Sequence, residues 1–241
     1  MALWLADKAA EGLAPATVEK IRVTFGRSFE LALRWNVPGV ERNPTRGIPR
    51  PPINNARSRF LSAEEARRLR DAVALSANPQ LKHIVGLLLL TGARISELLK
   101  AEWRNVDVER RLWLIPTSKT GKSRHVPLSQ AALDVIEQLP RFKDCPYLVP
   151  NPRTQRPFTD IKHPWQTARR LARLDDLHIH DLRHSAASFM INAGIDLYAV
   201  GKVLGHANHA STMRYSHVAP VTLLAAVEAG ADKMKLDWAG A

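Results

Sequence analysis

The sequence is poor in cysteine and in long hydrophobic runs, and each scarcity excludes a class of protein. Cys145 is the only cysteine among 241 residues, so no disulfide can form within one chain, which fits a reducing cytosol. The longest apolar run covers residues 84–93, is too short to cross a bilayer and predicts a buried helix. The N-terminal residues lack the apolar core of a signal peptide. We therefore expect a cytoplasmic protein with no membrane partner.

Acidic residues are also scarce relative to basic ones. The chain has 35 lysines and arginines against 23 aspartates and glutamates, which gives a net charge of +12 and a pI of about 10.3. Such an excess indicates a polyanionic partner, although a basic but unspecialised surface is the alternative. The length allows one large domain or two smaller ones, and the 45% of hydrophobic residues lies in the globular range.

The first segment predicts one strong helix from about Pro15 to Trp35. Proline suits a first-turn position, and an apolar stripe recurs at helical spacing at Val18, Ile21, Phe25, Phe29 and Ala32. Three basic residues, seven apart, fall on the opposite face: Lys20, Arg27 and Arg34. This face is either solvated or in contact with phosphates.

A stretch rich in proline and arginine follows the first segment. Residues 44–59 hold four prolines and four arginines with no periodicity, which is typical of a semi-extended linker. The four arginines are candidate phosphate contacts: Arg46, Arg50, Arg57 and Arg59. We place a domain boundary near residue 55, with a first domain over 1–48, a linker over 49–59 and a second domain over 60–241.

The second domain is predicted to be mainly α-helical with a small antiparallel β-sheet, an α+β fold. Ser62 and Glu65 have the spacing of a capping box, which starts a helix at Ala63. The pattern then predicts helices over 81–90 and 95–101. Three short strands follow over 106–108, 112–115 and 124–127. Further helices are expected over 129–139, 163–174, 180–193, 196–204 and 221–234, with a short helical turn at 212–215.

Six residues of this domain carry the chemistry that we expect. They are two guanidiniums, one ammonium, two imidazoles and one phenol: Arg94, Lys119, His180, Arg183, His206 and Tyr215. Together they form a cationic set around one potential nucleophile, as required when an oxygen attacks a phosphodiester and negative charge develops. A tyrosine hydroxyl acts as a nucleophile only with cationic neighbours or a base beside it. A tyrosine without such neighbours is usually a packing residue.

Each local signal also has a simpler interpretation. Glu97 lies three residues after Arg94 and either braces that side chain beside a phosphate or forms a surface ion pair of little value. The spacing of His180 and His184, which we expect to lie side by side, also occurs in zinc sites. We discount a metal because an aspartate replaces the glutamate of the hydrolytic zinc motif and Arg183 would face the dication. Lys119 is expected at a hairpin tip, where Lys122 competes for its role and Arg124 follows.

At catalytic-motif level, about residues 57–218 resemble the tyrosine recombinase (phage integrase) family. The matching frames are T-G-A-R-I-S-E, H-D-L-R-H and L-G-H followed by T-M-R-Y. The resemblance implies a site-specific DNA recombinase that cuts and rejoins strands without metal, ATP or another cofactor. It implies that Tyr215 attacks the scissile phosphate to form a 3′-phosphotyrosyl link, while Arg94 and Arg183 clamp the phosphate.

The same resemblance implies the remaining roles. Lys119 would protonate the departing 5′ oxygen, His180 would help to accept the tyrosine proton and His206 would bind a phosphate oxygen. Glu97 would support the site. Contacts to double-stranded DNA are expected from basic residues of both domains: Lys20, Arg27, Arg34, Arg46, Arg50, Arg57, Arg59, Lys122 and Arg124.

The family also implies a setting and an assembly. We expect a nucleoid-associated bacterial or phage protein of a mobile element that serves DNA integration. It would be a monomer or weak oligomer alone and a tetramer on DNA, with the 221–234 helix docked either on a neighbour or on its own domain. Residues 1–48 resemble only part of a helical core-binding domain. The alternatives are therefore a truncated relative that binds DNA without recombining it, and a topoisomerase-like relaxing enzyme.

Overall fold

The computed structural model describes residues 1–53, 59–116, 123–206 and 210–213. The chain divides into two compact units, Met1–Arg57 and Ser58–Ala241, and each is considered by itself. Several sequence predictions fall outside the described residues: those for Arg57, Lys119, Lys122, Tyr215 and the 221–234 helix. Among the described helices, none combines the length and apolar character needed to cross a membrane.

The smaller unit consists of two helices, α1 (Ala2–Ala10) and α2 (Pro15–Arg34). The predicted helix corresponds to α2, which begins at Pro15 as expected. α1 was not predicted, and no side chain caps its N-terminus. The two helices meet through Trp4 and Phe25, whose ring centroids lie 5.4 Å apart in an edge-to-face arrangement.

The segment after α2 folds back onto that helix. Asn43 donates from Nδ2 to the carbonyl oxygen of Gly26 at 3.0 Å and to Oε1 of Glu30 at 2.9 Å. Thr45 is buried against the same glycine, where an added Cβ would lie 2.6 Å from Thr45 Oγ1. The beginning of the proline-rich stretch therefore packs on α2, and Gly26 allows this close approach.

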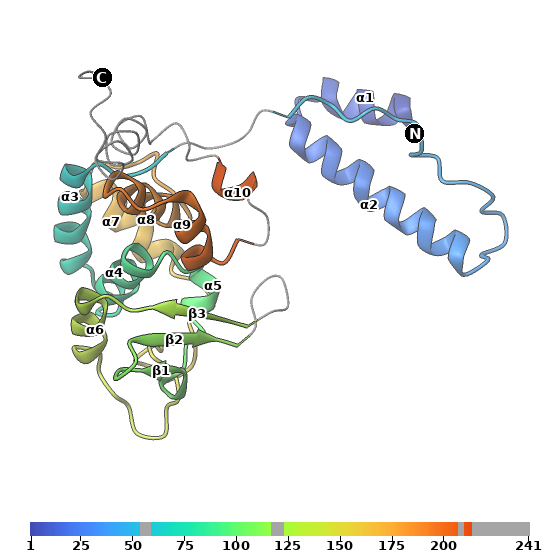
Figure 1. Cartoon of the computed structure of the whole chain (residues 1–241). Coiled ribbons are helices and arrows are strands. Elements are labelled where there is room, and N and C mark those ends of the chain that lie inside the picture. Colours follow the sequence, from blue (N-terminus) through green and yellow to red (C-terminus); the bar gives the residue numbers. More distant parts are fainter. Residues whose placement is uncertain (54–58, 117–122, 207–209, 214–241) are drawn as a thin grey trace, which may run out of the picture. The chain divides into compact units, whose positions relative to one another are not determined.

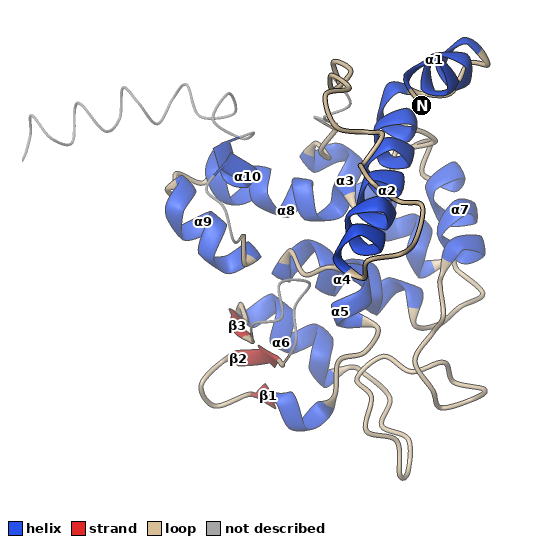
Figure 2. Cartoon of the chain, turned by 90° about the vertical axis from the view of Figure 1, so that its right-hand side faces the viewer, coloured by secondary structure: helices blue, strands red, loops and turns tan. Residues whose placement is uncertain are grey.

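The larger unit is built around α4 (Leu81–Thr91). This helix packs against α3 (Ala63–Ala74), α6 (Gln130–Glu137) and α8 (Asp181–Asn192), as Figures 1 and 2 show. Most of α4 is buried, as predicted for its apolar run, and it contributes to a core that is continuous through the unit. The predicted capping box at the start of α3 is confirmed, with both hydrogen bonds between Ser62 and Glu65 formed.

A three-stranded antiparallel sheet lies beside α5 and α6 at one end of the unit (Figure 1). Its strands, in the order β1-β2-β3, are Val106–Asp107, Leu112–Ile115 and Arg124–Pro127. The register pairs Ile115 with Arg124 and Trp113 with Val126. Trp113 and Ile115 are buried on one face of β2, so the sheet packs one side against the core. The predicted fold class is confirmed.

The remaining elements surround these layers. They are α5 (Ile95–Leu98), the 3₁₀-helix η1 (Trp103–Asn105), α7 (Lys162–Leu171), α9 (Leu197–Leu204) and α10 (Ala210–Met213). Ser129 and Asp196 cap α6 and α9 through their side chains.

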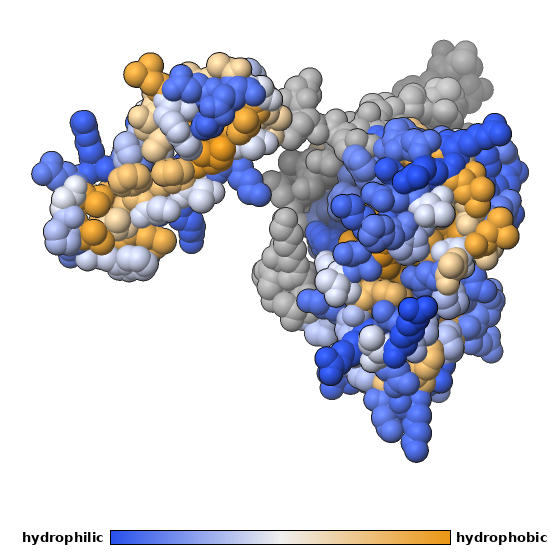
Figure 3. Space-filling model, turned by 180° about the vertical axis from the view of Figure 1, so that it is seen from behind, coloured by the Kyte–Doolittle hydropathy of each residue, from blue (hydrophilic) through white to orange (hydrophobic). Residues whose placement is uncertain are grey.

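The surfaces of the two units differ in character. Hydrophilic residues dominate the face of the larger unit that Figure 3 presents, whereas the smaller unit shows a band of apolar residues. Exposed apolar side chains of the smaller unit include Leu3, Val23 and Trp35. An apolar surface on so small a unit is typical of an incomplete core or of a contact surface.

Candidate active site

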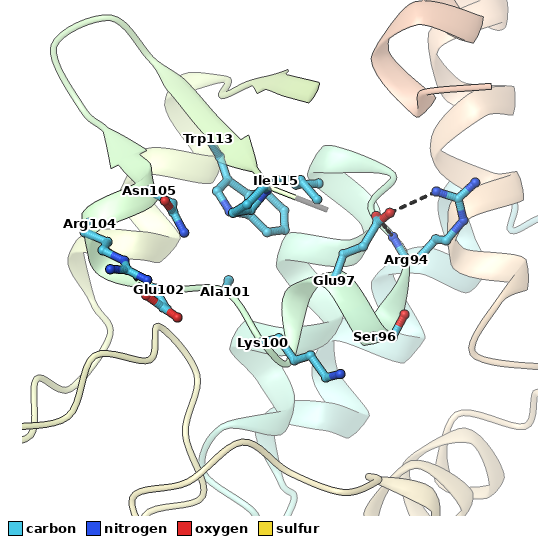
Figure 4. Close-up of a pocket in the computed structure, with 11 residues that line it drawn as sticks. Arg94, Ser96, Glu97, Lys100, Ala101, Glu102, Arg104, Asn105, Trp113 and Ile115 are labelled. Carbon is cyan, nitrogen blue, oxygen red and sulfur yellow. Dashed lines mark hydrogen bonds and ion pairs between the residues drawn. The ribbon is translucent and has the colours of Figure 1, made fainter. Parts of the chain in front are cut away.

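Arg94 is held at the junction between α4 and α5. α4 ends at Thr91 and is capped by Gly92, which adopts the left-handed conformation with φ of 62°. Arg94 is the N-cap of α5 and has an extended backbone, so it lies just before the helix. The first helical residue is Ile95, as predicted. Its Nη1 donates to Glu97 Oε1 at 2.9 Å, and its backbone N–H donates to Glu97 Oε2 at 2.9 Å (Figure 4). Glu97 therefore contacts Arg94 directly, as their spacing predicted, and its support of a phosphate-binding Arg94 stays a prediction.

Glu97 is held more firmly by Arg124, the first residue of β3. Arg124 donates from Nη1 to Oε1 at 2.7 Å and from Nη2 to Oε2 at 2.8 Å, the two-pronged geometry of a strong charge-assisted pair. Burial alone raises the pKa of the Glu97 carboxyl, but hydrogen bonds from Arg124 and Arg94 outweigh it and bring the pKa down to about 2. Glu97 is therefore ionised throughout the neutral range.

Arg183 is buried at the centre of the site. Its Nη1 donates to the carbonyl oxygen of Gly92, and its Nη2 donates to that of Leu204, both at 2.7 Å. These carbonyls lie at the C-terminal ends of α4 and α9, where helices leave oxygens without intrahelical partners and favour cations. One guanidinium on α8 therefore fixes the ends of two other helices. Those ends lead directly to Arg94 and to His206.

His180 lies at the N-terminus of α8, three residues before Arg183. It is the N-cap residue and is exposed, whereas His184 is buried within the helix. The two rings meet edge to face with centroids 5.2 Å apart, so the prediction that these histidines lie side by side is confirmed. Within the described part of the chain, no group of three or more His, Cys, Asp or Glu side chains is arranged to hold a metal ion.

His206 follows the left-handed cap of α9, Gly205. Its backbone N–H donates to the carbonyl oxygen of Gly201 at 3.0 Å, and its Nδ1 lies 2.8 Å from Thr212 Oγ1. Thr212 is itself buried against Gly201, where an added Cβ would lie 2.8 Å from the threonine hydroxyl. Thr212 has no role in the sequence-based prediction, although its place in the T-M-R-Y frame is the signal that points to it.

The structure thus groups four of the six predicted residues around the ends of three helices. Arg94 follows α4, His180 and Arg183 open α8, and His206 follows α9. The other two, Lys119 and Tyr215, lie outside the described residues. A cavity of about 500 Å³ adjoins Arg94 and Glu97 on the side of the sheet, with Lys100 and Trp113 among its lining residues (Figure 4).

The basic residues predicted to contact DNA fall into two groups. Three side chains on α2 are exposed: Lys20, Arg27 and Arg34. Arg46 and Arg50 are also largely exposed but lie within ion-pair distance of carboxylates, at 3.0 Å from Glu30 and 3.9 Å from Glu19. Contact with DNA by these residues stays a prediction.

Arg59 and Arg124 differ from that group because carboxylates of the larger unit hold both. Arg59 donates to Glu65 at 2.7 Å and to Asp176 at 2.7 Å, and these hydrogen bonds raise its pKa further. The hydrogen bond from Arg59 to Glu65 also lowers the pKa of the Glu65 carboxyl to about 2. Arg59 therefore ties the start of this unit to the segment that precedes α8.

With this geometry established, comparison with known proteins identifies the family. The model of the phage integrase family matches residues 59–221. The chain belongs to the phage integrase family. Its fold is also that of the catalytic domain of the bacteriophage HP1 integrase, with a TM-score of 0.57, 30% identity and coverage of 70% of this chain and 93% of that one.

Other family members are more distant or longer. The shufflon-specific DNA recombinase of Escherichia coli is 29% identical over 83% of this chain and 53% of its own length. The tyrosine recombinase XerA of Pyrococcus horikoshii is 30% identical over 75% of this chain and 64% of its own. A lambda integrase fragment, solved as a dimer bound to a COC′ core site, shares the fold at a TM-score of 0.70 with 20% identity, over 89% of this chain and 77% of that one. The chain spans about half to three quarters of the length of the curated relatives that it matches.

Proposed function

We propose that this phage integrase family member is a site-specific DNA recombinase that breaks and rejoins strands through a 3′-phosphotyrosyl intermediate, without metal or ATP. One observation carries the proposal. Arg183 bonds the carbonyls of Gly92 and Leu204, and these residues stand two positions before Arg94 and His206. The buried Arg183 guanidinium therefore holds in place the two segments that carry Arg94 and His206, the side chains that we assign to the phosphate.

The transfer step follows from the chemistry of these groups. The Tyr215 hydroxyl oxygen attacks phosphorus and gives its proton to His180, and the bond from phosphorus to the 5′ oxygen breaks. Lys119 supplies a proton to that leaving oxygen. Arg94 and Arg183 stabilise the negative charge that develops on the phosphate oxygens. Because the phosphotyrosyl bond retains the energy of the phosphodiester, a 5′ hydroxyl of a second strand reverses the step.

Thr212 gives His206 a defined part in this step. When the Thr212 hydroxyl donates to Nδ1 at their 2.8 Å separation, the proton of the neutral ring resides on Nε2. That N–H then donates to a non-bridging phosphate oxygen. With the hydroxyl as donor, the contact favours the tautomer of His206 that binds phosphate.

Double-stranded DNA is the partner that the charge and the relatives favour. The net charge of +12 suits a polyanion, and the lambda and Tn1549 integrases were solved on core-site and circular-intermediate DNA. We infer assembly as a tetramer on DNA in the cytoplasm, in association with the nucleoid. Residues 1–48 act as part of a core-binding domain, and their exposed apolar side chains, such as Leu3 and Trp35, suit a contact surface.

The net charge of +12 and the exposed basic side chains of α2 also suit one competing function, a relative that binds DNA without recombining it. Nicked suicide duplexes that tile the DNA flanking its gene separate the two functions. The recombinase forms an adduct that survives denaturation in detergent, and the Tyr215→Phe variant forms none. The recombinase proposal fails if wild-type protein binds one tile specifically and forms no adduct on it.

A further inference from the structure

Glu97 accepts hydrogen bonds from two arginines through both of its oxygens. Oε1 receives Nη1 of Arg94 at 2.9 Å and Nη1 of Arg124 at 2.7 Å. Oε2 receives the backbone N–H of Arg94 at 2.9 Å and Nη2 of Arg124 at 2.8 Å. Four donors match the acceptor sites of one carboxylate. Glu97 is therefore fully used as an anchor between the two arginines and is not available to move a proton.

Arg124 is well suited to hold this anchor because its position is itself fixed. It opens β3 opposite Ile115, and only 12% of its side chain is exposed, against 5% of the Glu97 side chain. The other side of Arg124 lies against Gly205, where an added Cβ would sit 2.4 Å from Cδ and 2.6 Å from Nε. The Arg124 side chain thus fills the space between Glu97 and the backbone next to His206.

We propose that Arg124 is a positioning residue that sets the orientation of Arg94 through Glu97, rather than a contact to DNA. The proposal rests on the proposed function, since Arg94 is there assigned to the phosphate. Through Arg124 the sheet reaches two catalytic segments: α5, which carries Glu97, and the turn after α9, which carries His206. A displacement of about 1 Å at a catalytic group costs on the order of a hundredfold in rate.

The sequence-based interpretation of Arg124 as a phosphate contact makes a different prediction. A residue that neutralises a phosphate contributes about one unit to the slope of log affinity against log salt concentration. A positioning residue leaves this slope unchanged and alters the rate of cleavage. The two roles therefore separate in measurements of binding and of chemistry on the same variants.

The experiment compares three variants with wild type: Arg124→Gln, Arg124→Lys and, as a matched loss of one charge, Arg110→Gln. Arg110 lies in the turn before β2 with 79% of its side chain exposed. Salt titrations use a duplex of arbitrary sequence, and single-turnover cleavage uses the suicide duplex that yields the wild-type adduct. We expect Arg124→Gln to cleave about a hundredfold more slowly with an unchanged salt slope. Arg124→Lys should recover part of the rate, and Arg110→Gln should cleave like wild type.

Wild-type cleavage by Arg124→Gln, or a salt slope reduced by about one unit, would overturn the proposal. A second measurement covers the case in which this variant is poorly folded or the wild type forms no adduct. Carboxyl-labelled glutamate followed by NMR reports the titration of Glu97 in the free protein. Among the described residues, the charged groups that face Glu97 are Arg94 and Arg124, so the pKa of Glu97 should rise by about 1 to 3 units in Arg124→Gln. An unchanged titration in folded Arg124→Gln contradicts the anchoring role, whereas a missing wild-type adduct contradicts only the proposed function.

Discussion

Arg183 donates a hydrogen bond from Nη1 to the carbonyl oxygen of Gly92 at 2.7 Å, across 91 residues of sequence. A second bond from Nη2 reaches Leu204, so the guanidinium connects α8 with the ends of α4 and α9. The side chain that we assign to the phosphate thus also holds together the backbone that carries its partners. Structure and chemistry are expected to fail together when it is changed.

Replacement of Arg183 by glutamine should lower the free energy of unfolding by about 3 kcal/mol or more, because two charge-assisted hydrogen bonds to buried carbonyls are lost. Urea denaturation measures the change. Arg67→Gln is the matched control, since Arg67 is exposed and forms an ion pair with its neighbour Glu64 within α3, and it should change stability by less than about 0.5 kcal/mol. Equal stability of the two variants would contradict the bridging role.

Gly92 should be far less tolerant of alanine than Gly194. Both adopt positive φ, but a Cβ at Gly92 would lie 2.5 Å from Leu204 Cδ2, whereas none of the described atoms lies within 4 Å of a Cβ at Gly194. Gly194→Ala should cost about 1 kcal/mol from its backbone conformation alone. Gly92→Ala adds about 1 to 3 kcal/mol of overpacking. Denaturation curves of the two variants isolate this steric difference, which would be absent if Leu204 packed elsewhere.

The ionised form of Glu97 should stabilise the fold over a defined range of pH. Its pKa is lowered from 4.5 to about 2, so its contribution is complete above pH 4.5 and is lost as the pH falls toward 2. In wild type, the free energy of unfolding should therefore decrease through this range, partly through Glu65, whose pKa is also about 2. Glu97→Gln should show a shallower decrease by urea denaturation at each pH, and an identical slope would refute the assignment.

Removal of the Thr212 hydroxyl should slow cleavage without weakening DNA binding. Thr212→Val keeps the shape that packs against Gly201 but cannot donate to His206 Nδ1, so we expect a loss of about tenfold in the single-turnover rate, equivalent to about 1.4 kcal/mol. Thr212→Ser retains the hydroxyl and should cleave nearly as fast as wild type. If both variants cleave alike, the tautomer of His206 does not depend on this contact.

Local sequence signals were sufficient for much of the fold. Ser62 with Glu65 predicted the start of α3, and the last two strands were predicted with the bounds that the structure gives them. α1 was not predicted, because no side-chain cap marks where it starts. These successes rest on residues close in sequence, where capping and alternation act directly.

The contacts that build the site could not be predicted in the same way. Arg124 meets Glu97 across 27 residues, and its position beside a turn suggested a contact to DNA instead. The bond from Arg183 to Gly92 spans more than three times that separation. Such pairs depend on how the helices and the sheet pack against one another, and local sequence patterns do not predict this packing. The motif frames nevertheless include residues that form these bonds, such as Arg94, Glu97 and Arg183, although the frames did not predict the bonds themselves.

The most direct test of the central claim is to locate the covalent bond between protein and DNA. Adducts formed on the suicide duplex are digested with protease and nuclease, and the peptide that carries the nucleotide is sequenced by mass spectrometry. The account predicts a 3′-phosphoryl nucleotide on the Tyr215 oxygen and the loss of this peptide in Tyr215→Phe. A nucleotide on any other side chain, or an adduct that persists in Tyr215→Phe, would contradict it.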